Sequence, residues 1–162
     1  MITNEGGIYM LKFSLTKKVR RLYQPKRADI QKWLQKAIIN QYQNIHIDIQ
    51  IVSKQTSQEL NLQYRHKDSA TNVISLEYKD SRDNYGVLYG ELFLCDDVIC
   101  EEAIAQHKSV QAHYAHMLIH GVLHLQGYDH QTDSEADIME RIEVEKLQEL
   151  GFNNPYGDIS NE

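Results

Sequence analysis

The stretch from His120 to His130 reads HGVLHLQGYDH, and it predicts the element around which the fold is built. His120 and His124 are four residues apart, so on a helix both imidazoles leave the same face about one turn apart. Gly127 follows three residues later, where a helix can end in the left-handed turn that glycine adopts at little cost. The chain can then turn back and bring His130 beside the first two. The spacing therefore predicts three converging imidazoles, the ligand set of a catalytic zinc with one position left for water.

His116 as a metal ligand and a peptidase as the enzyme class are two alternatives to this interpretation. His116 continues the histidine face, but about 12 Å of helical rise separates it from His124, which is too far for ligand bonds of about 2 Å. Metzincin peptidases share the histidine and glycine spacing, but they place a glutamate directly after the first histidine as general base. Here that residue is Gly121. The pattern favours a hydrolase of another class, since a metallopeptidase would need a carboxylate from elsewhere, such as Glu91.

Two segments of the chain resemble a known family. HGVLHLQGYDH matches HGxLHLxGYDH at every fixed position, which is the signature of the YbeY family of bacterial single-strand-specific endoribonucleases. Residues 60–76, LNLQYRHKDSATNVISL, are similar to the family's approximate pattern LNxxYRxKDxPTDVLSF. They depart from it at Ala70, Asn72, Ile74 and Leu76. The similarity runs from about residue 10 to residue 152, and it is specific only in these two segments.

Arg65 is the predicted catalytic cation. A phosphodiester gains negative charge in its transition state, so a nuclease site needs a cation that is not a metal ligand. A guanidinium binds phosphate oxygens in a bidentate way, and Arg65 directly precedes a polar loop that could lie near the metal. The resemblance places Arg65 on the family's catalytic arginine. The predicted site therefore holds one zinc ion on His120, His124 and His130, with Arg65 and His120 as catalytic residues acting on single-stranded RNA.

The resemblance also implies a biological role. That role is maturation of the 3′ end of 16S ribosomal RNA and ribosome quality control, with ribosomal RNA, the ribosome and ribosomal proteins as partners. A non-catalytic alternative is a structural zinc in a ribosome-assembly protein, in which Cys95 or Cys100 closes the fourth position.

Several other residues have two interpretations each. Asp129 either orients a metal ligand or simply favours the turn. A stacking face for unpaired bases is one interpretation, and ordinary core or surface the other, for Tyr78, Tyr85, Tyr89 and Tyr114. Helix-surface or packing positions are expected for His107, His113 and His116.

Length and composition indicate one compact domain. The chain has 162 residues, 41% of them hydrophobic, and a net charge of −6, which does not favour nucleic-acid binding. The charges are unevenly spread, however. Residues 12–36 hold nine basic side chains and one acid, whereas residues 133–149 hold seven acids and two basic side chains. This asymmetry fits a basic RNA-facing side, and it fits two ordinary solvated faces equally well.

The sequence suggests a soluble cytoplasmic protein that does not associate with membranes. The segment MITNEGGIYM has no apolar run fit for a signal peptide, and no stretch approaches the roughly 18 apolar residues of a membrane span. The two cysteines are too few for a disulfide framework and are expected to be free thiols.

Hydrophobic periodicity predicts an α+β fold: a small mixed β-sheet packed against several helices, with the metal site at the end of a buried helix. Helices are expected at residues 26–42, 57–65, 96–107, 109–126 and 132–150. Strands are expected at 45–52, 73–78 and 87–94, with a short strand-like run from residue 10. The last two strands should form a hairpin, in which Gly90 marks a bulge or a close approach of substrate.

The predicted boundaries are a flexible N-terminal extension over residues 1–9, a single metal-dependent hydrolase domain over 10–152 and a flexible tail over 153–162. Translation could begin at Met1 or at Met10.

Overall fold

A five-stranded mixed sheet and five helices make up the part of the chain that the computed structural model describes, which is residues 2–4, 7–21, 23–78 and 86–157. The strands are β1 (Ile2–Asn4), β2 (Gly7–Lys17), β3 (Asn44–Val52), β4 (Val73–Glu77) and β5 (Val87–Cys95). The helices are α1 (Arg27–Ala37), α2 (Lys54–Arg65), α4 (Asp96–Ala105), α5 (Val110–Leu125) and α6 (Asp133–Glu149). The predicted α+β class is confirmed.

The sheet has the strand order β1-β2-β3-β5-β4. β3 is its central strand and pairs in parallel with β2 and β5, while β1 and β4 are antiparallel to their neighbours. The isoleucines at alternate positions of β3 are all buried, as expected of a strand with one face in the core: Ile45, Ile47, Ile49 and Ile51. The expected pairing of β4 with β5 is confirmed, whereas the predicted turn between them lies largely outside the described residues.

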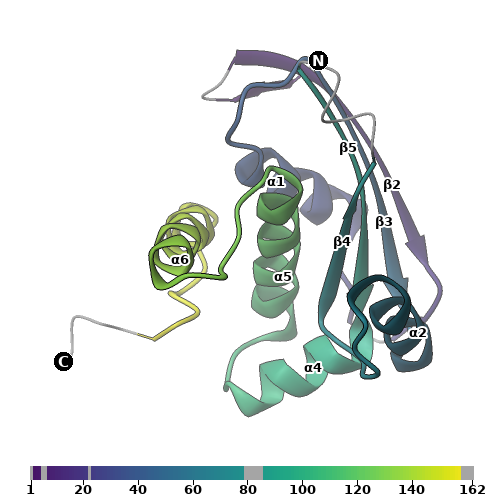
Figure 1. Cartoon of the computed structure of the whole chain (residues 1–162). Helices are drawn as coiled ribbons and strands as arrows, with labels where there is room; N and C mark the ends of the chain where they lie inside the picture. The colour runs from purple at the N-terminus through teal and green to yellow at the C-terminus, as the bar shows by residue number, and fades with distance from the viewer. Residues whose placement is uncertain (1, 5–6, 22, 79–85, 158–162) are drawn as a thin grey trace.

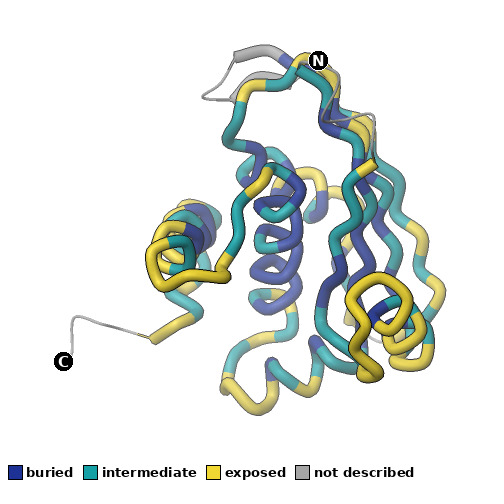
Figure 2. The backbone as a smooth tube through the Cα atoms, viewed as in Figure 1, coloured by how far each residue is buried: buried dark blue, intermediate teal, exposed yellow. Residues whose placement is uncertain are grey.

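Helix α5 is the centre of the core. It lies between the sheet and α6, as Figure 1 shows, and the burial view in Figure 2 shows that it is buried along most of its length. On the opposite face of the sheet, Leu60 of α2 packs against a smaller cluster of Val52, Ile74 and Phe93. Helix α5, which carries His120 and His124, is therefore held by sheet and helices rather than by loops.

Two glycines let α5 approach the sheet closely. A Cβ built on Gly90 of β5 would lie 2.7 Å from Cδ2 of Leu125, and one on Gly121 would lie 2.9 Å from Cδ2 of Leu92. The register of β5 runs through Gly90 without an extra residue. The prediction of a bulge or a substrate approach at Gly90 is therefore wrong, because the close neighbour is a leucine side chain of α5.

Helix α1 ends earlier than predicted, at Ala37 rather than near residue 42. The reason is Gln126, which follows α5. Its Nε2 donates to the carbonyl of Ala37 at 2.7 Å, and its Oε1 accepts from the amides of Ile39 at 3.0 Å and Asn40 at 3.1 Å. One side chain thus satisfies backbone groups on both sides of the helix end and ties α1 to α5.

The two ends of the described chain are partly held in the fold. β2 begins at Gly7, before the predicted start of the strand, and Tyr9 is buried. After α6, the amide of Phe152 donates to the carbonyl of Leu147, and the Phe152 ring packs edge-on against Trp33. The domain boundaries themselves stay a prediction. None of the helices that the structure describes is long and apolar enough to cross a bilayer.

Candidate metal centre

The turn after α5 brings the third histidine back to the helix. Gly127 has a φ of +99°, and its amide donates to the carbonyl of His124 at 3.0 Å. The amide of Tyr128 donates to the carbonyl of Leu123 at 3.1 Å. These bonds end the helix in the left-handed turn that the glycine predicted. Asp129 then accepts a hydrogen bond from the amide of His130 at 2.8 Å, so its contact is with the turn backbone.

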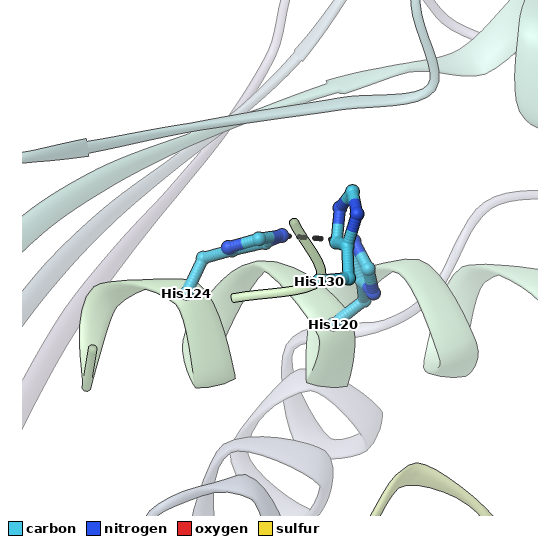
Figure 3. Close-up of side chains that lie close together, drawn as sticks. All are labelled: His120, His124 and His130. Carbon is cyan, nitrogen blue, oxygen red and sulfur yellow. Dashed lines mark hydrogen bonds between the residues drawn. The ribbon is translucent and has the colours of Figure 1, made fainter. Parts of the chain in front are cut away.

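His120, His124 and His130 converge on one point. One ring nitrogen from each lies within 4.8 Å of the others, and Nε2 of His120 is 3.1 Å from Nε2 of His124. Figure 3 shows His120 and His124 leaving the same face of α5 with His130 beside them. Two nitrogens bound to one tetrahedral zinc at about 2.0–2.1 Å would lie about 3.3 Å apart. The three side chains therefore fit a metal ion, and the donor set suits zinc among other transition metals.

The protonation state of His124 suits a ligand. Burial, together with the neighbouring charges of His120 and His130, lowers the pKa of His124 to about 4. The ring is therefore neutral at pH 7, which is the form that can bind a metal.

A buried glutamate supports His120 from behind. Nδ1 of His120 donates to Oε1 of Glu143 at 2.9 Å, and Nε2 of His116 donates to the same oxygen at 2.8 Å. Burial favours the neutral form of the 1% exposed Glu143, but the hydrogen bonds and charges of the two histidines outweigh it and hold its pKa at about 2. With Nδ1 bonded to the carboxylate, Nε2 of His120 is left to face Nε2 of His124.

Glu143 is absent from the residues predicted from the sequence, where it counted only as one of the acids of the last helix. A signal was available. Met139 and Leu147, four residues before and after it, are buried on the inward stripe of α6, and Glu143 continues that stripe. A carboxylate on the buried side of an amphipathic helix needs a partner, because a buried charge is unfavourable without one.

A pocket of about 630 Å³ opens beside His124. It is lined by Tyr64, Arg65, Ser75, Leu76, Glu77, Tyr78, Glu91, His124 and Leu125. Arg65 is the last residue of α2, and partial burial lowers the pKa of its guanidinium. Its charge is also among the influences that lower the pKa of His124. The predicted cation thus shares one pocket with a predicted metal ligand.

Glu91 lines the same pocket. Burial, with a smaller effect from the charge of Asp48, raises the pKa of its carboxyl group. At the position where metzincins carry their base, by contrast, a side chain would collide with the sheet. The Cβ of any residue at Gly121 would meet Leu92, Val73 and Ser75 within 3.1 Å.

The structure also gives the positions of the other histidines and of several of the tyrosines considered above. His113 and His116 are buried packing residues, as expected, and His107 is exposed. Of the two interpretations of Tyr114, the core position is confirmed and the stacking face is excluded, because the side chain is fully buried and donates to Asp96. Tyr85 lies outside the described residues, while Tyr78 lines the pocket.

Asn72, one of the departures from the family pattern, has a clear contact. Its side-chain amide donates to Glu102 at 3.1 Å, and Glu102 in turn accepts from Nε2 of His113 at 2.8 Å. The residue thus links the end of the polar loop to α4 and α5. Within the described part of the chain, the histidine group includes neither Cys95 nor Cys100. This counts against a cysteine as the fourth ligand.

The chain matches known proteins over most of its length. The family model described as Endoribonuclease YbeY matches residues 15–151. A protein of Cupriavidus metallidurans named Endoribonuclease YbeY is 44% identical over 135 residues, which cover 83% of this chain and 66% of the relative. One of the same name from Nitrosococcus oceani is 42% identical over 137 residues, which cover 83% of this chain and 90% of the relative. The chain thus spans just under two thirds of the length of the Cupriavidus relative.

A solved structure agrees on the fold alone. The solution structure of a Thermotoga maritima protein is 22% identical, with a TM-score of 0.51 over 94% of this chain and 99% of that one. The family match and the two sequence relatives carry the assignment. The chain therefore belongs to the YbeY family of endoribonucleases.

Proposed function

We propose that the chain is a zinc-dependent endoribonuclease that cleaves single-stranded RNA. The observation that carries this proposal is that three imidazoles converge on one point and that one of them, His124, lines the same pocket as the guanidinium of Arg65. Membership of the YbeY family supports RNA as the substrate.

His120, His124 and His130 would hold the ion in this site. When bound there, zinc would supply Lewis acidity toward a phosphoryl oxygen and toward the attacking group. Arg65 binds the non-bridging oxygens of the scissile phosphate and stabilises the charge that grows on them. The turn at Gly127 supports this assignment, because it brings His130 back beside α5.

Aromatic side chains at the pocket support a preference for single strands. Tyr64 is 49% exposed and Tyr78 is 41% exposed, and both line the pocket next to Arg65. A base can stack on a tyrosine ring only when it is not paired within a duplex, and such stacking contributes about 1–3 kcal/mol per base. The two rings therefore favour unpaired RNA near the metal ligands.

The biological role that we propose is maturation of the 3′ end of 16S ribosomal RNA and ribosome quality control in the cytoplasm. Family membership supports this role, with ribosomal RNA, the ribosome and ribosomal proteins as partners.

Paired substitutions test the chemistry. His124→Ala should lose both bound zinc and cleavage of an unstructured RNA. Arg65→Ala should keep its zinc while kcat falls by roughly 10²–10³, the usual effect of removing one group that stabilises transition-state charge. Arg65→Lys keeps the charge without the bidentate geometry and should recover only part of the rate. Full activity in Arg65→Ala would contradict the role of the arginine.

Peptide hydrolysis is the second candidate, because Glu91 places a carboxyl group in the same pocket. Casein cleavage that disappears in Glu91→Gln, together with no RNA cleavage by the unmodified protein, would favour a peptidase. For the structural-zinc alternative, the Cys95→Ser, Cys100→Ser double variant should keep its metal if our proposal is correct.

A further inference from the structure

The segment after α6 returns to the metal centre. The predicted tail begins at residue 153, yet the side chain of Asn154 accepts a hydrogen bond from the amide of Tyr156 at 2.9 Å. Together with the contact of Phe152 on Trp33, this turn directs Tyr156 toward α5 and α6. The Tyr156 ring packs edge-on against the ring of His116, with a centroid distance of 5.3 Å.

Tyr156 completes the set of partners around Glu143. Its hydroxyl donates to Oε2 of Glu143 at 3.1 Å and lies 3.2 Å from Nε2 of His116. The other carboxylate oxygen, Oε1, accepts from His116 and His120. Burial and the negative charge of Glu143 raise the pKa of the Tyr156 phenol, so it stays protonated and keeps its donor.

The geometry gives the hydroxyl a specific effect. A carboxylate held at only one oxygen can rotate about its last side-chain bond, and its lone pair then moves away from the imidazole. With the second oxygen held by Tyr156, the lone pair of Oε1 stays directed at Nδ1 of His120. That contact fixes the ring orientation and the tautomer in which Nε2 is available to a metal.

We propose that Tyr156 is a positioning residue of the metal centre, acting on His120 through Glu143. The proposal rests on the proposed role of the three histidines as zinc ligands. On this proposal, the segment after α6 contributes to the orientation of His120 and hence to zinc binding.

Zinc affinity of Tyr156→Phe is the first test, measured by competition with a chromophoric chelator. Outer partners of metal-bound histidines typically change affinity 10- to 100-fold, so Glu143→Gln should weaken zinc binding by about that factor. Tyr156 acts one step further out, and we expect its loss to weaken binding by roughly 3- to 10-fold. The matched control is Tyr23→Phe, which removes a hydroxyl from a similarly exposed ring that is not part of the Glu143 cluster. This control substitution should leave the zinc affinity unchanged.

A double-mutant cycle separates positioning from general packing. If Tyr156 acts through Glu143, then Tyr156→Phe should have little further effect on zinc affinity in a Glu143→Gln background. The visible spectrum of the cobalt-loaded protein, which reports the ligand field, should differ between Tyr156→Phe and the unmodified protein. The melting temperature without metal should be nearly the same for both.

The outcomes distinguish this inference from the proposed function. If the unmodified protein binds zinc no better than His124→Ala, the metal centre itself is wrong. If the unmodified protein binds zinc tightly and Tyr156→Phe binds it within twofold of that affinity, the role of Tyr156 is overturned. An undiminished effect of Tyr156→Phe in the Glu143→Gln background would overturn it as well, since the hydroxyl would then act by another route.

Discussion

At Gly121, α5 lies very close to the sheet. The methyl group of an alanine at this position would lie only 2.9–3.1 Å from atoms of Leu92, Val73 and Ser75. Replacing a glycine inside a helix with alanine ordinarily stabilises by about 0.5–1 kcal/mol. Here we expect the opposite sign, with Gly121→Ala lowering the free energy of unfolding by about 1–3 kcal/mol because the packed neighbours must shift. Urea unfolding followed by circular dichroism measures the difference. A more stable variant would show that α5 can move away from the sheet.

His113 gives the stability of the metal-free protein a pH dependence. Burial lowers its pKa, and the charges of Lys108 and His116 act in the same direction, while Glu102 opposes them. The folded chain therefore takes up fewer protons than the unfolded chain once the pH falls below the ordinary value of about 6.5, and unfolding becomes easier.

We expect the free energy of unfolding, measured in the presence of a chelator, to fall as the pH is lowered from about 7.5 to 5.5. The slope should be shallower in His113→Gln, although not zero, because His124 contributes with the same sign. An unchanged slope in His113→Gln would mean that the folded chain takes up the proton at this position without loss of stability.

The residues of the site differ in how far the sequence could predict them. The convergence of the three histidines depends on helix periodicity and on one glycine turn, both of which are local, and the spacing therefore predicted it. Glu143 and Tyr156 reach the site only because α6 and the segment after it pack against α5. The periodicity of its helix places Glu143 on the buried face but does not say which element it meets, and a tyrosine in a polar terminal segment carries no periodic signal.

Among the elements, the C-terminal end of α1 is bonded to the end of α5 through the side chain of Gln126. Replacing it with alanine leaves the carbonyl of Ala37 and two amides without that partner in a half-buried place. We expect Gln126→Ala to lower the free energy of unfolding by about 2–3 kcal/mol. The matched control is Gln111→Ala, at an exposed position of α5, which should change the free energy of unfolding by less than about 0.5 kcal/mol. Equal effects of the two substitutions in urea unfolding would contradict this account.

For the strands, the local sequence pattern predicts that a strand forms but not which strand it pairs with. The alternation in residues 45–52 predicted β3 well, because one face of it is fully buried. The position of β5 between β3 and β4 could not be obtained in this way. It depends on parallel pairing between strands that are separated by more than thirty residues in the sequence, and hydrophobic alternation contains no information on the choice of partner.

For the molecule as a whole, we expect the core to form without the proposed zinc ion. The buried hydrophobic cluster runs through the sheet, α1, α5 and α6, and these contacts are between apolar side chains that bind no metal. Removing zinc should therefore leave a folded protein of lower stability. At a zinc concentration about 100 times the dissociation constant, binding contributes about 2.7 kcal/mol, or roughly 5–10 °C in Tm. His124→Ala should show no such shift on adding zinc, and a chelated protein without a cooperative transition would contradict the prediction.

The order of the site along the chain has a consequence for synthesis. Translation delivers His120, His124 and His130 before α6, and Tyr156 emerges later still. A nascent chain can thus expose all three imidazoles while the carboxylate and phenol behind them have yet to emerge from the ribosome. If our two proposals are correct, chains that terminate before Tyr156 should exchange zinc more readily than the full chain, so that firm retention of the ion marks a polypeptide that includes Tyr156.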